Sequence, residues 1–166
     1  NNAPSIHTGK IIDMDMAAWK TNFKANLDAV FLTTKKVLPW MMTAKKGAIV
    51  NIASVVGLKG VAYMSAYGAA KAGLINFTKA SAIEAAPHVR INCIIPGAVQ
   101  TPATERAIPD KKIMEITKNS IPLKRIADPM EIAHPILFLL SQNASFITAA
   151  SLIVDGGKTG DLNAGN

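Results

Sequence analysis

The sequence predicts an α/β fold in which buried strands of an open sheet alternate with long helices. Two short runs rich in β-branched residues, 47–54 and 89–97, have the length and composition of buried strands. The first run ends in a serine and the second in Pro-Gly. We expect both strands to end at the same edge of one sheet, which is where ligands bind in this class of fold.

The other elements are expected in order along the chain. A helix should run from about Met16 to Met42, ahead of the first strand. A loop should then lead through Met64 into a second helix that ends before Pro87. The second strand should lead into a mobile stretch from residue 98 to about residue 125, and a last strand should cover residues 152–154.

A further helix is expected to begin at Asp128. This residue suits the N-cap, Pro129 suits the first turn, and Glu131 can reach back to the cap. Pro135 would remove a hydrogen bond from that helix at a cost of about 3 kcal/mol, so we expect a kink there or a later start. Residues 158–166 are polar and contain glycine, and are expected to form a C-terminal tail.

Composition fits part of one α/β domain and excludes several classes of partner. The chain has 166 residues, of which 49% are hydrophobic and 17% charged, with no sign of a second domain. No apolar run reaches the roughly 18 residues of a membrane span. The net charge is +7, but basic residues occur as scattered pairs without interleaved aromatics, so we expect solvated helix faces and no nucleic-acid partner. These pairs are Lys35-Lys36, Lys45-Lys46 and Lys111-Lys112.

Cysteine and histidine usage also limits the possibilities. Cys93 is the single cysteine, which excludes an intrachain disulfide and fits a reducing cytoplasm. The three histidines, His7, His88 and His134, lack the spacing of metal ligands, so no metal site is expected.

Tyr67 and Lys71 are the most informative pair in the sequence, because residues four apart share one face of a helix. A free phenol has a pKa of about 10, and a nearby cation stabilises its phenolate. We therefore expect Lys71 to lower the pKa of Tyr67 toward neutrality, which would suit general acid-base chemistry. The pair alone could also belong to an ordinary amphipathic helix.

Several further motifs occur with this pair, and in this order they resemble the short-chain dehydrogenase/reductase family over almost the whole chain. They are Asn1-Asn2-Ala3, Trp19 with Asn26, Asn51-Ile52-Ala53-Ser54, Tyr67 with Lys71, Pro96-Gly97 with Thr101, the helix start 128–133, and Val154-Asp155-Gly156-Gly157. The resemblance implies a Rossmann-like, doubly wound parallel sheet. Residues 1–166 would be one partial domain that holds its C-terminal strands and helices.

The resemblance also implies an NAD(P)-dependent oxidoreductase that interconverts a secondary alcohol and a ketone. Tyr67 would be the general acid or base, and Lys71 would hold the nicotinamide ribose. Ser54 would hydrogen-bond the substrate oxygen, and Asn26 would anchor a water chain to Lys71. Taken alone, Ser54 could be a turn cap, whereas Asn26 is a poor helix former inside an expected helix. Asn51 is expected to be structural and to bond the backbone between neighbouring strands.

Cofactor and substrate contacts follow from the same resemblance. The residues matched to cofactor binding are Asn2, Ala3, Tyr67, Lys71, Pro96, Gly97, Val99 and Thr101. The residues matched to the substrate pocket are Ser54, Val61, Met64 and Tyr67, with Leu58 and a substrate loop at 98–127 beside them. They imply a modest, largely apolar carbonyl or alcohol with one polar end. For Thr101, a turn-stabilising role is the alternative.

The glycine-rich turn that holds the cofactor pyrophosphate in this family is absent from the 166 residues. The sequence therefore does not distinguish NAD from NADP, and we expect a preceding segment to supply the turn. The strand at 48–52 would otherwise present a bare edge, so residues 1–166 alone are not expected to form a stable soluble domain.

Two other functions compete with the oxidoreductase. A serine hydrolase would need a base near Ser54, but the sequence has no GxSxG elbow and no plausible histidine partner. A catalytically inactive relative, acting as a binding or oligomerisation module, is the stronger alternative. The apolar faces of the helices 19–42 and 67–86 exceed what one sheet face needs, and family members use these helices to form dimers or tetramers. Both faces could instead simply pack on the sheet.

Overall fold

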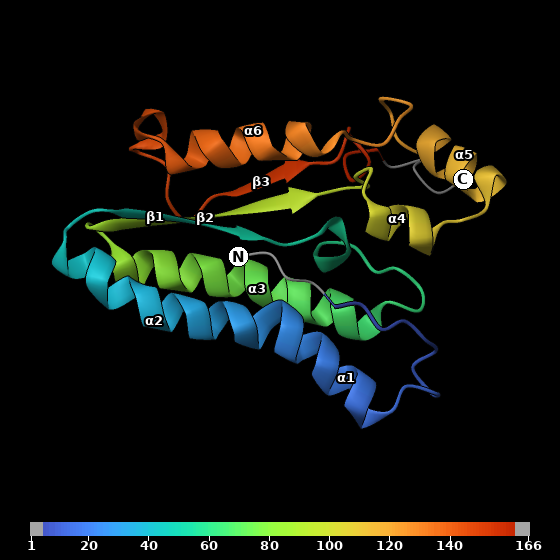
Figure 1. The fold of residues 1–166 in the computed structure, drawn as a ribbon, viewed down its shortest axis with the longest axis horizontal. Helices are drawn as coiled ribbons and strands as arrows, with labels where there is room; N and C mark the ends of the chain where they lie inside the picture. Colours follow the sequence, from blue (N-terminus) through green and yellow to red (C-terminus); the bar gives the residue numbers. More distant parts are fainter. Residues whose placement is uncertain (1–4, 162–166) are drawn as a thin grey trace.

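A three-stranded parallel sheet forms the centre of the molecule. The computed structural model describes residues 5–161, in which β1 (Gly47–Ile52) pairs with β2 (Val89–Pro96), and β2 pairs with β3 (Ser151–Val154). All three strands point the same way, and helices cover both faces of the sheet (Figure 1). The predicted α/β fold with a parallel sheet is confirmed.

One face of the sheet is covered by the first half of the chain. Helix α1 (Met16–Phe23), a π-helical segment, η1 (Lys24–Asp28), and α2 (Ala29–Thr43) follow one another without a break (Figure 1). Both α2 and α3 (Ser65–Ala85) pack on the strands, because side chains of the two helices belong to the same core clusters as β1 and β2. The predicted extents of both helical regions are confirmed. The π-helical turn at Asn26 was not predicted.

The opposite face is covered by α6 (Pro129–Leu140), which begins where the sequence predicts. Asp128 accepts a hydrogen bond from the amide of Met130, and the Glu131 side chain accepts one from the amide of Asp128. Pro135 lies inside the helix, so the alternative of a later start is wrong.

β2 is the strand on which both layers pack. Its side chains alternate between the two faces of the sheet. Ile91, Cys93 and Ile95 belong to the clusters that pack toward the α2 and α3 layer, and Ile94 belongs to the cluster under α6. All four are fully buried. Arg90 at the start of β2 donates hydrogen bonds to carbonyl oxygens at the C-terminal end of α6 and just beyond it, at Leu139, Leu140, Ser141 and Ile147.

The stretch from 98 to 125, expected to be mobile, has helical structure that was not predicted. It contains α4 (Pro102–Ala107) and α5 (Lys111–Asn119), which lie beyond the carboxyl ends of the strands (Figure 1). Thr101 caps α4 and Asp110 caps α5. Each cap residue marks the start of its own short helix, so both helices could have been predicted from these two residues.

The last described residues form a turn. Asp155 accepts hydrogen bonds from the amides of Gly157 and Thr159 and from the Thr159 hydroxyl. The predicted tail therefore begins within a turn that covers residues 156–160, and residues 162–166 lie outside the described residues. Within residues 5–161, no helix is long and apolar enough to cross a membrane.

Candidate active site

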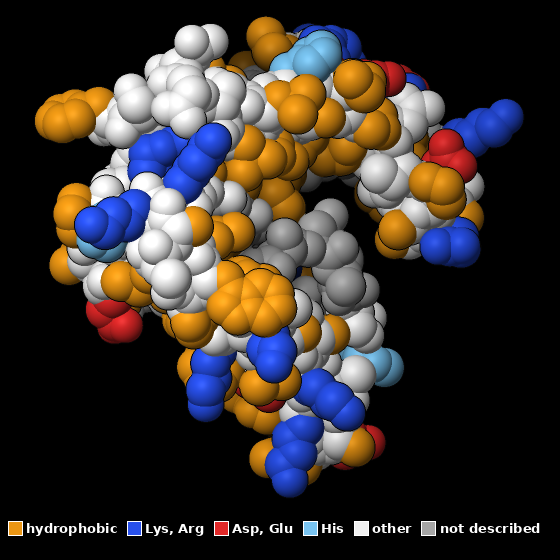
Figure 2. Space-filling view, turned by 60° about the vertical axis from the view of Figure 1, so that its left-hand side comes forward, with side chains coloured by type: hydrophobic (Ala, Val, Ile, Leu, Met, Phe, Trp, Pro, Cys, Tyr) orange, Lys and Arg blue, Asp and Glu red, His pale blue; other side chains and the backbone are white. Residues whose placement is uncertain are grey.

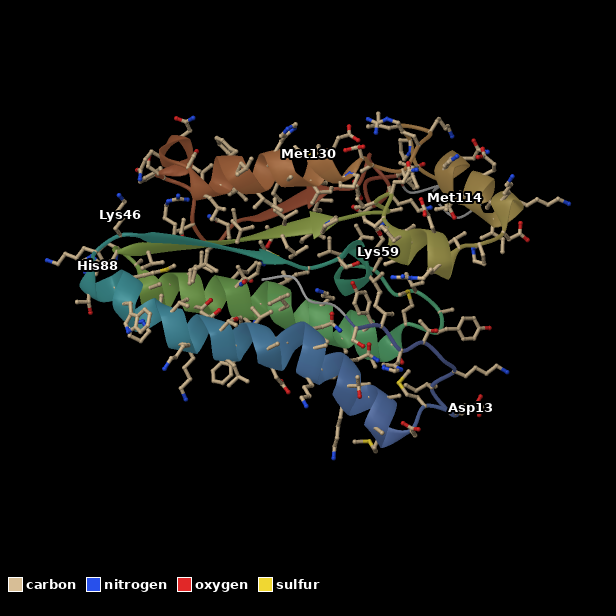
Figure 3. The ribbon with its side chains drawn as sticks, in the orientation of Figure 1. Asp13, Lys46, Lys59, His88, Met114 and Met130 are labelled. Carbon is tan, nitrogen blue, oxygen red and sulfur yellow. The ribbon has the colours of Figure 1, made fainter. Side chains whose placement is uncertain are left out.

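Ser54 lies just past the carboxyl end of β1, as the sequence predicts. Lys59, five residues later, is at the same end of the molecule as α4, whereas Lys46 and His88 lie at the opposite end (Figure 3). Ser54 caps the short 3-10 turn Val55–Gly57 (η2), because its Oγ accepts a hydrogen bond from the amide of Val56 at 3.3 Å. It also shares a hydrogen bond with the side chain of Tyr67. The turn-cap alternative for Ser54 is therefore present, and the catalytic role stays a prediction.

Tyr67 and Lys71 lie one turn apart on the buried face of α3. Their exposed fractions are only 7% and 4%. The Nζ of Lys71 lies 5.7 Å from the centroid of the Tyr67 ring and donates a 2.8 Å hydrogen bond to the carbonyl oxygen of Ile52. The ammonium is thus held between the end of β1 and the tyrosine ring.

The electrostatics differ from the prediction. Burial raises the pKa of Tyr67 above its ordinary value, and the hydrogen bond with Ser54 acts in the opposite direction. Burial also lowers the pKa of Lys71 to about 8, opposed by interaction with Cys93. The expectation that Lys71 would bring the pKa of Tyr67 down was wrong for this arrangement, because desolvation of the phenolate dominates.

Asn26 lies in the π-helical segment η1 and is almost completely buried. Its Nδ2 donates to the carbonyl oxygens of Ser5 and Asn22, at 2.7 and 2.9 Å. Its Oδ1 is buried and has no hydrogen-bond partner among the described residues. A buried, unpartnered amide oxygen is uncommon, and π-helical turns often occur at functional sites.

Asn22 is a residue that the sequence analysis missed. It lies one turn before Asn26 and is fully buried. Its Nδ2 donates to the carbonyl oxygen of His7, and its Oδ1 accepts from the amide of the same residue. The signal was present, since a second asparagine occurs four residues before Asn26 in the expected helix. Together the two asparagines tie the segment at Ser5 to His7 onto the helix.

The residues matched to cofactor binding fall into two groups. Pro96 ends β2, and the amide of Gly97 donates to the carbonyl oxygen of Val154 at 2.9 Å. Val99 pairs with Ala127, and Thr101 caps α4, so the turn-stabilising role of Thr101 is present. All four lie at or just after the carboxyl end of β2. Asn2 and Ala3 lie outside the described residues.

The predicted pocket residues do not line one cavity. Val61, Met64 and Leu58 line a groove of about 370 Å³ beside α3, which neither Ser54 nor Tyr67 lines. Ala98 and Ile121 instead line a small cavity of about 90 Å³ near the start of α6. Asn51 donates to the hydroxyl of Thr78 on α3, and this bond joins β1 to the helix. Asn92 of β2 bonds the backbone of Ile147 and Ala150, a link that was not predicted.

Among residues 5–161, no cluster of three or more histidine, cysteine and carboxylate side chains could hold a metal ion. His134 is exposed on α6, and His88 lies at the far end of the sheet from Ser54 (Figure 3). The serine hydrolase alternative therefore gains no base from these two residues.

Comparison with known proteins gives consistent matches. The family model described as enoyl-(acyl carrier protein) reductase matches residues 1–159. Cyclopentanol dehydrogenase of Comamonas testosteroni is 38% identical over 160 residues, which cover 96% of this chain and 64% of that protein. The chain thus spans slightly under two thirds of that relative's length.

Solved structures agree with the sequence matches. The ligand-free aldohexose dehydrogenase of Thermoplasma acidophilum superposes with a TM-score of 0.94 at 33% identity, covering 98% of this chain and 68% of that one. ElxO, solved with NADP bound, superposes with a TM-score of 0.91 at 27% identity, covering 97% of this chain and 66% of that one.

Proposed function

The chain belongs to the short-chain dehydrogenase/reductase family, and from this we propose that it is an NAD(P)-dependent oxidoreductase that interconverts a secondary alcohol and a ketone. The observation that carries the proposal is the cluster of a partly buried Ser54 with the buried Tyr67 and Lys71 at the carboxyl end of β1. The relatives named above act on cyclopentanol and on aldohexoses by their names, and the proposed substrate is likewise a small carbonyl or alcohol.

The described residues fit the nicotinamide end of such a cofactor. An ammonium has three donor hydrogens, and the hydrogen bond of Lys71 to Ile52 uses one of them, so it has donors left for the two hydroxyls of a ribose. The backbone after Pro96 lies at the same edge of the sheet, where dinucleotides bind in doubly wound folds. A bound nicotinamide cofactor supplies or accepts the hydride.

The chain's own residues handle the proton. In the reducing direction, Tyr67 donates its phenolic proton to the carbonyl oxygen of the substrate while Ser54 hydrogen-bonds the same oxygen. In the oxidising direction, the phenolate accepts that proton back. Because burial raises the pKa of Tyr67, the phenol stays protonated at neutral pH, which favours its action as an acid. The role proposed for Lys71 is to hold the nicotinamide ribose, because its charge does not bring the pKa of Tyr67 below its ordinary value.

The proposal is tested by replacing Tyr67 with phenylalanine in the full-length protein. We expect the turnover of NAD(P)H with a panel of small ketones to fall by about 10²–10⁴-fold, with nearly unchanged cofactor binding by calorimetry. Tyr63→Phe is the matched control, because Tyr63 is 58% exposed in the loop before α3. Equal turnover in the two variants would refute the role of Tyr67.

We also propose that a segment preceding Asn1 supplies the missing pyrophosphate turn and pairs with β1. In the described sheet β1 is an edge strand, and a groove of about 420 Å³ runs along it between α2 and α6. The groove is mostly apolar and lined by Thr33, Val37, Ala48, Ile49, Val50, Ile52, Ile136 and Leu140. Hydrophobic side chains gather around a hollow between the two helix layers in Figure 2.

Association of two copies through α2 and α3 is the proposed assembly, giving a dimer or tetramer. Phe31 and Trp40 on α2 and Ile83 on α3 are 45%, 72% and 74% exposed. A groove of about 570 Å³ between α2 and α3 is lined by Phe31, Lys35 and Glu84 among others, so a symmetric partner could pair the opposite charges of Lys35 and Glu84. We expect Ile83→Glu to convert the assembly to a smaller species in sedimentation velocity, and an unchanged sedimentation coefficient would count against this interface.

We also propose a cytoplasmic location, and one alternative function is considered beside the oxidoreductase. Cys93 is a free, buried thiol in β2, which agrees with the proposed cytoplasmic location. The alternative, a catalytically inactive binding or oligomerisation module, predicts that Tyr67→Phe changes nothing measurable. The same experiment therefore separates the two functions.

A further inference from the structure

The turn that carries Ser54 packs against α3 with almost no space between them, and two glycines permit this contact. A Cβ atom on Gly57 of η2 would lie 2.8 Å from the carbonyl carbon of Lys71 and 2.9 Å from the amide nitrogen of Ala72. A Cβ atom on Gly68 of α3 would lie 3.0 Å from the carbonyl oxygen of Val56. Contacts below 3.0 Å with backbone atoms cannot be relieved by turning a side chain, so η2 and α3 would have to separate.

The same loop contains a glycine without this restriction. Gly60 lies three residues after Gly57, and a Cβ atom there would have no neighbour within 4 Å. The close contact with α3 is therefore made at Gly57 and not along the whole loop. Gly68 lies inside α3, where glycine costs about 1 kcal/mol relative to alanine, so its presence needs an explanation.

Both contacts are next to the reacting groups. Gly57 follows Ser54 by three residues, and its amide closes the turn on the Ser54 carbonyl oxygen at 2.9 Å. Gly68 directly follows Tyr67, and Lys71 provides the backbone that Gly57 touches. The turn is short and internally hydrogen-bonded, so a displacement at Gly57 is transmitted to Ser54.

We propose that Gly57 and Gly68 are positioning residues that hold the Ser54 turn against α3 and so set the distance from the Ser54 hydroxyl to the Tyr67 phenol. The inference deepens the proposed function and rests on it for the catalytic consequence. The geometric part, that the glycines set a hydrogen bond between two side chains, does not depend on any activity.

The test measures the ionisation of Tyr67 directly, by NMR of the full-length protein labelled with ¹³C at the tyrosine ring. The Tyr67 signal is assigned by its loss in Tyr67→Phe. The Ser54 hydrogen bond lowers the pKa of Tyr67, so Ser54→Ala should raise that pKa. This variant therefore serves as the reference for the shift expected when the bond is lost. The titratable groups that interact in this cluster are Lys71 on α3 and Cys93 on β2, with Lys79 acting on Cys93, and all three are kept in every variant.

Gly57→Ala should raise the pKa of Tyr67 in the same direction as Ser54→Ala, and Gly60→Ala should leave it as in the unmodified protein. In turnover assays, Gly57→Ala should lower kcat by about 10- to 100-fold, with the KM for cofactor nearly unchanged, because a displacement of about 1 Å is enough for such a loss. A Tyr67 titration in Gly57→Ala that matches Gly60→Ala would overturn the inference.

Two further outcomes are informative. If Gly57→Ala does not fold, Gly68→Ala takes its place, since its added methyl group meets Val56 less severely, and the same titration decides. If Gly57→Ala shifts the titration while Tyr67→Phe retains full turnover, the positioning role stands and the proposed function fails. A thermal melt of each variant separates both results from a general loss of structure.

Discussion

Replacing Lys71 with methionine should make the protein more stable at neutral pH while removing its proposed activity. Lys71 is 4% exposed, and burial lowers its pKa from 10.5 to about 8. The folded protein therefore holds this charge less favourably than the unfolded chain does. Methionine keeps an unbranched stem of similar size and introduces no charge.

The expected size of the effect follows from the pKa. The interval from 10.5 to about 8, at about 1.4 kcal/mol per pH unit, corresponds to a penalty of about 3 kcal/mol at pH 7. Methionine also removes the donor to the Ile52 carbonyl oxygen, which costs about 1–2 kcal/mol. We expect Lys71→Met to raise the free energy of unfolding by about 1–2 kcal/mol at pH 7.

The pH dependence gives a sharper signature than the single value. Between about pH 8 and 10.5 the unfolded lysine keeps its proton and the folded one loses it, so the unmodified protein gains stability as the pH rises. The advantage of Lys71→Met should therefore shrink above pH 8. Burial raises the pKa values of Tyr67 and Cys93, which makes stability fall at high pH in both proteins. Because the charge on Lys71 also lowers the pKa of Cys93, the difference between the two proteins reports Lys71 together with this interaction.

The assay is urea unfolding of the full-length protein at several pH values from 7 to 10. Lys79→Met is the matched control, because Lys79 is an exposed lysine two turns further along α3. The control should match the unmodified protein in its free energy of unfolding and in how that free energy changes with pH. If Lys71→Met is less stable at pH 7 and its difference from the unmodified protein does not change with pH, the burial penalty at Lys71 is refuted.

Two other predictions concern the scaffold. Arg90→Met should lower the free energy of unfolding by about 2–3 kcal/mol, because four carbonyl oxygens lose their donor. Urea unfolding measures this change, and an unchanged free energy would mean that those bonds contribute nothing. Residues 1–166 expressed alone should aggregate and lack a cooperative melt, since β1 is an edge strand of the described sheet beside an apolar groove, and a sharp, reversible transition would contradict this.

Local signals explain why much of the fold could be predicted from the sequence. The start of α6 depends on Asp128 and Glu131, which act within one turn, and the structure confirms that start. β2 ends at Pro96, and α3 ends before Pro87, where the sequence carries its own stop signals. The four-residue spacing of Tyr67 and Lys71 likewise predicted that both lie on one face of a helix.

The missed features depend on contacts between distant segments. The pKa of Tyr67 follows from its burial under several elements, which residue spacing does not reveal. The role of Asn92 was not predicted, because which strand passes beside the loop near Ile147 is decided by the sheet order. The π-helical turn at Asn26 has no local sequence rule, since it accompanies side-chain bonds to Ser5, 21 residues away.

Several features of the site lower the stability of the fold, and this favours an enzyme over a passive module. Lys71 is a buried cation, the Oδ1 of Asn26 is buried without a partner among the described residues, and Gly68 weakens the helix that contains it. A binding or oligomerisation module would gain stability by replacing each of them, because α2 and α3 expose their apolar side chains on other faces. Destabilising features of this kind are concentrated at functional sites. If Lys71→Met proves more stable and inactive, the buried charge is there for catalysis and not for folding.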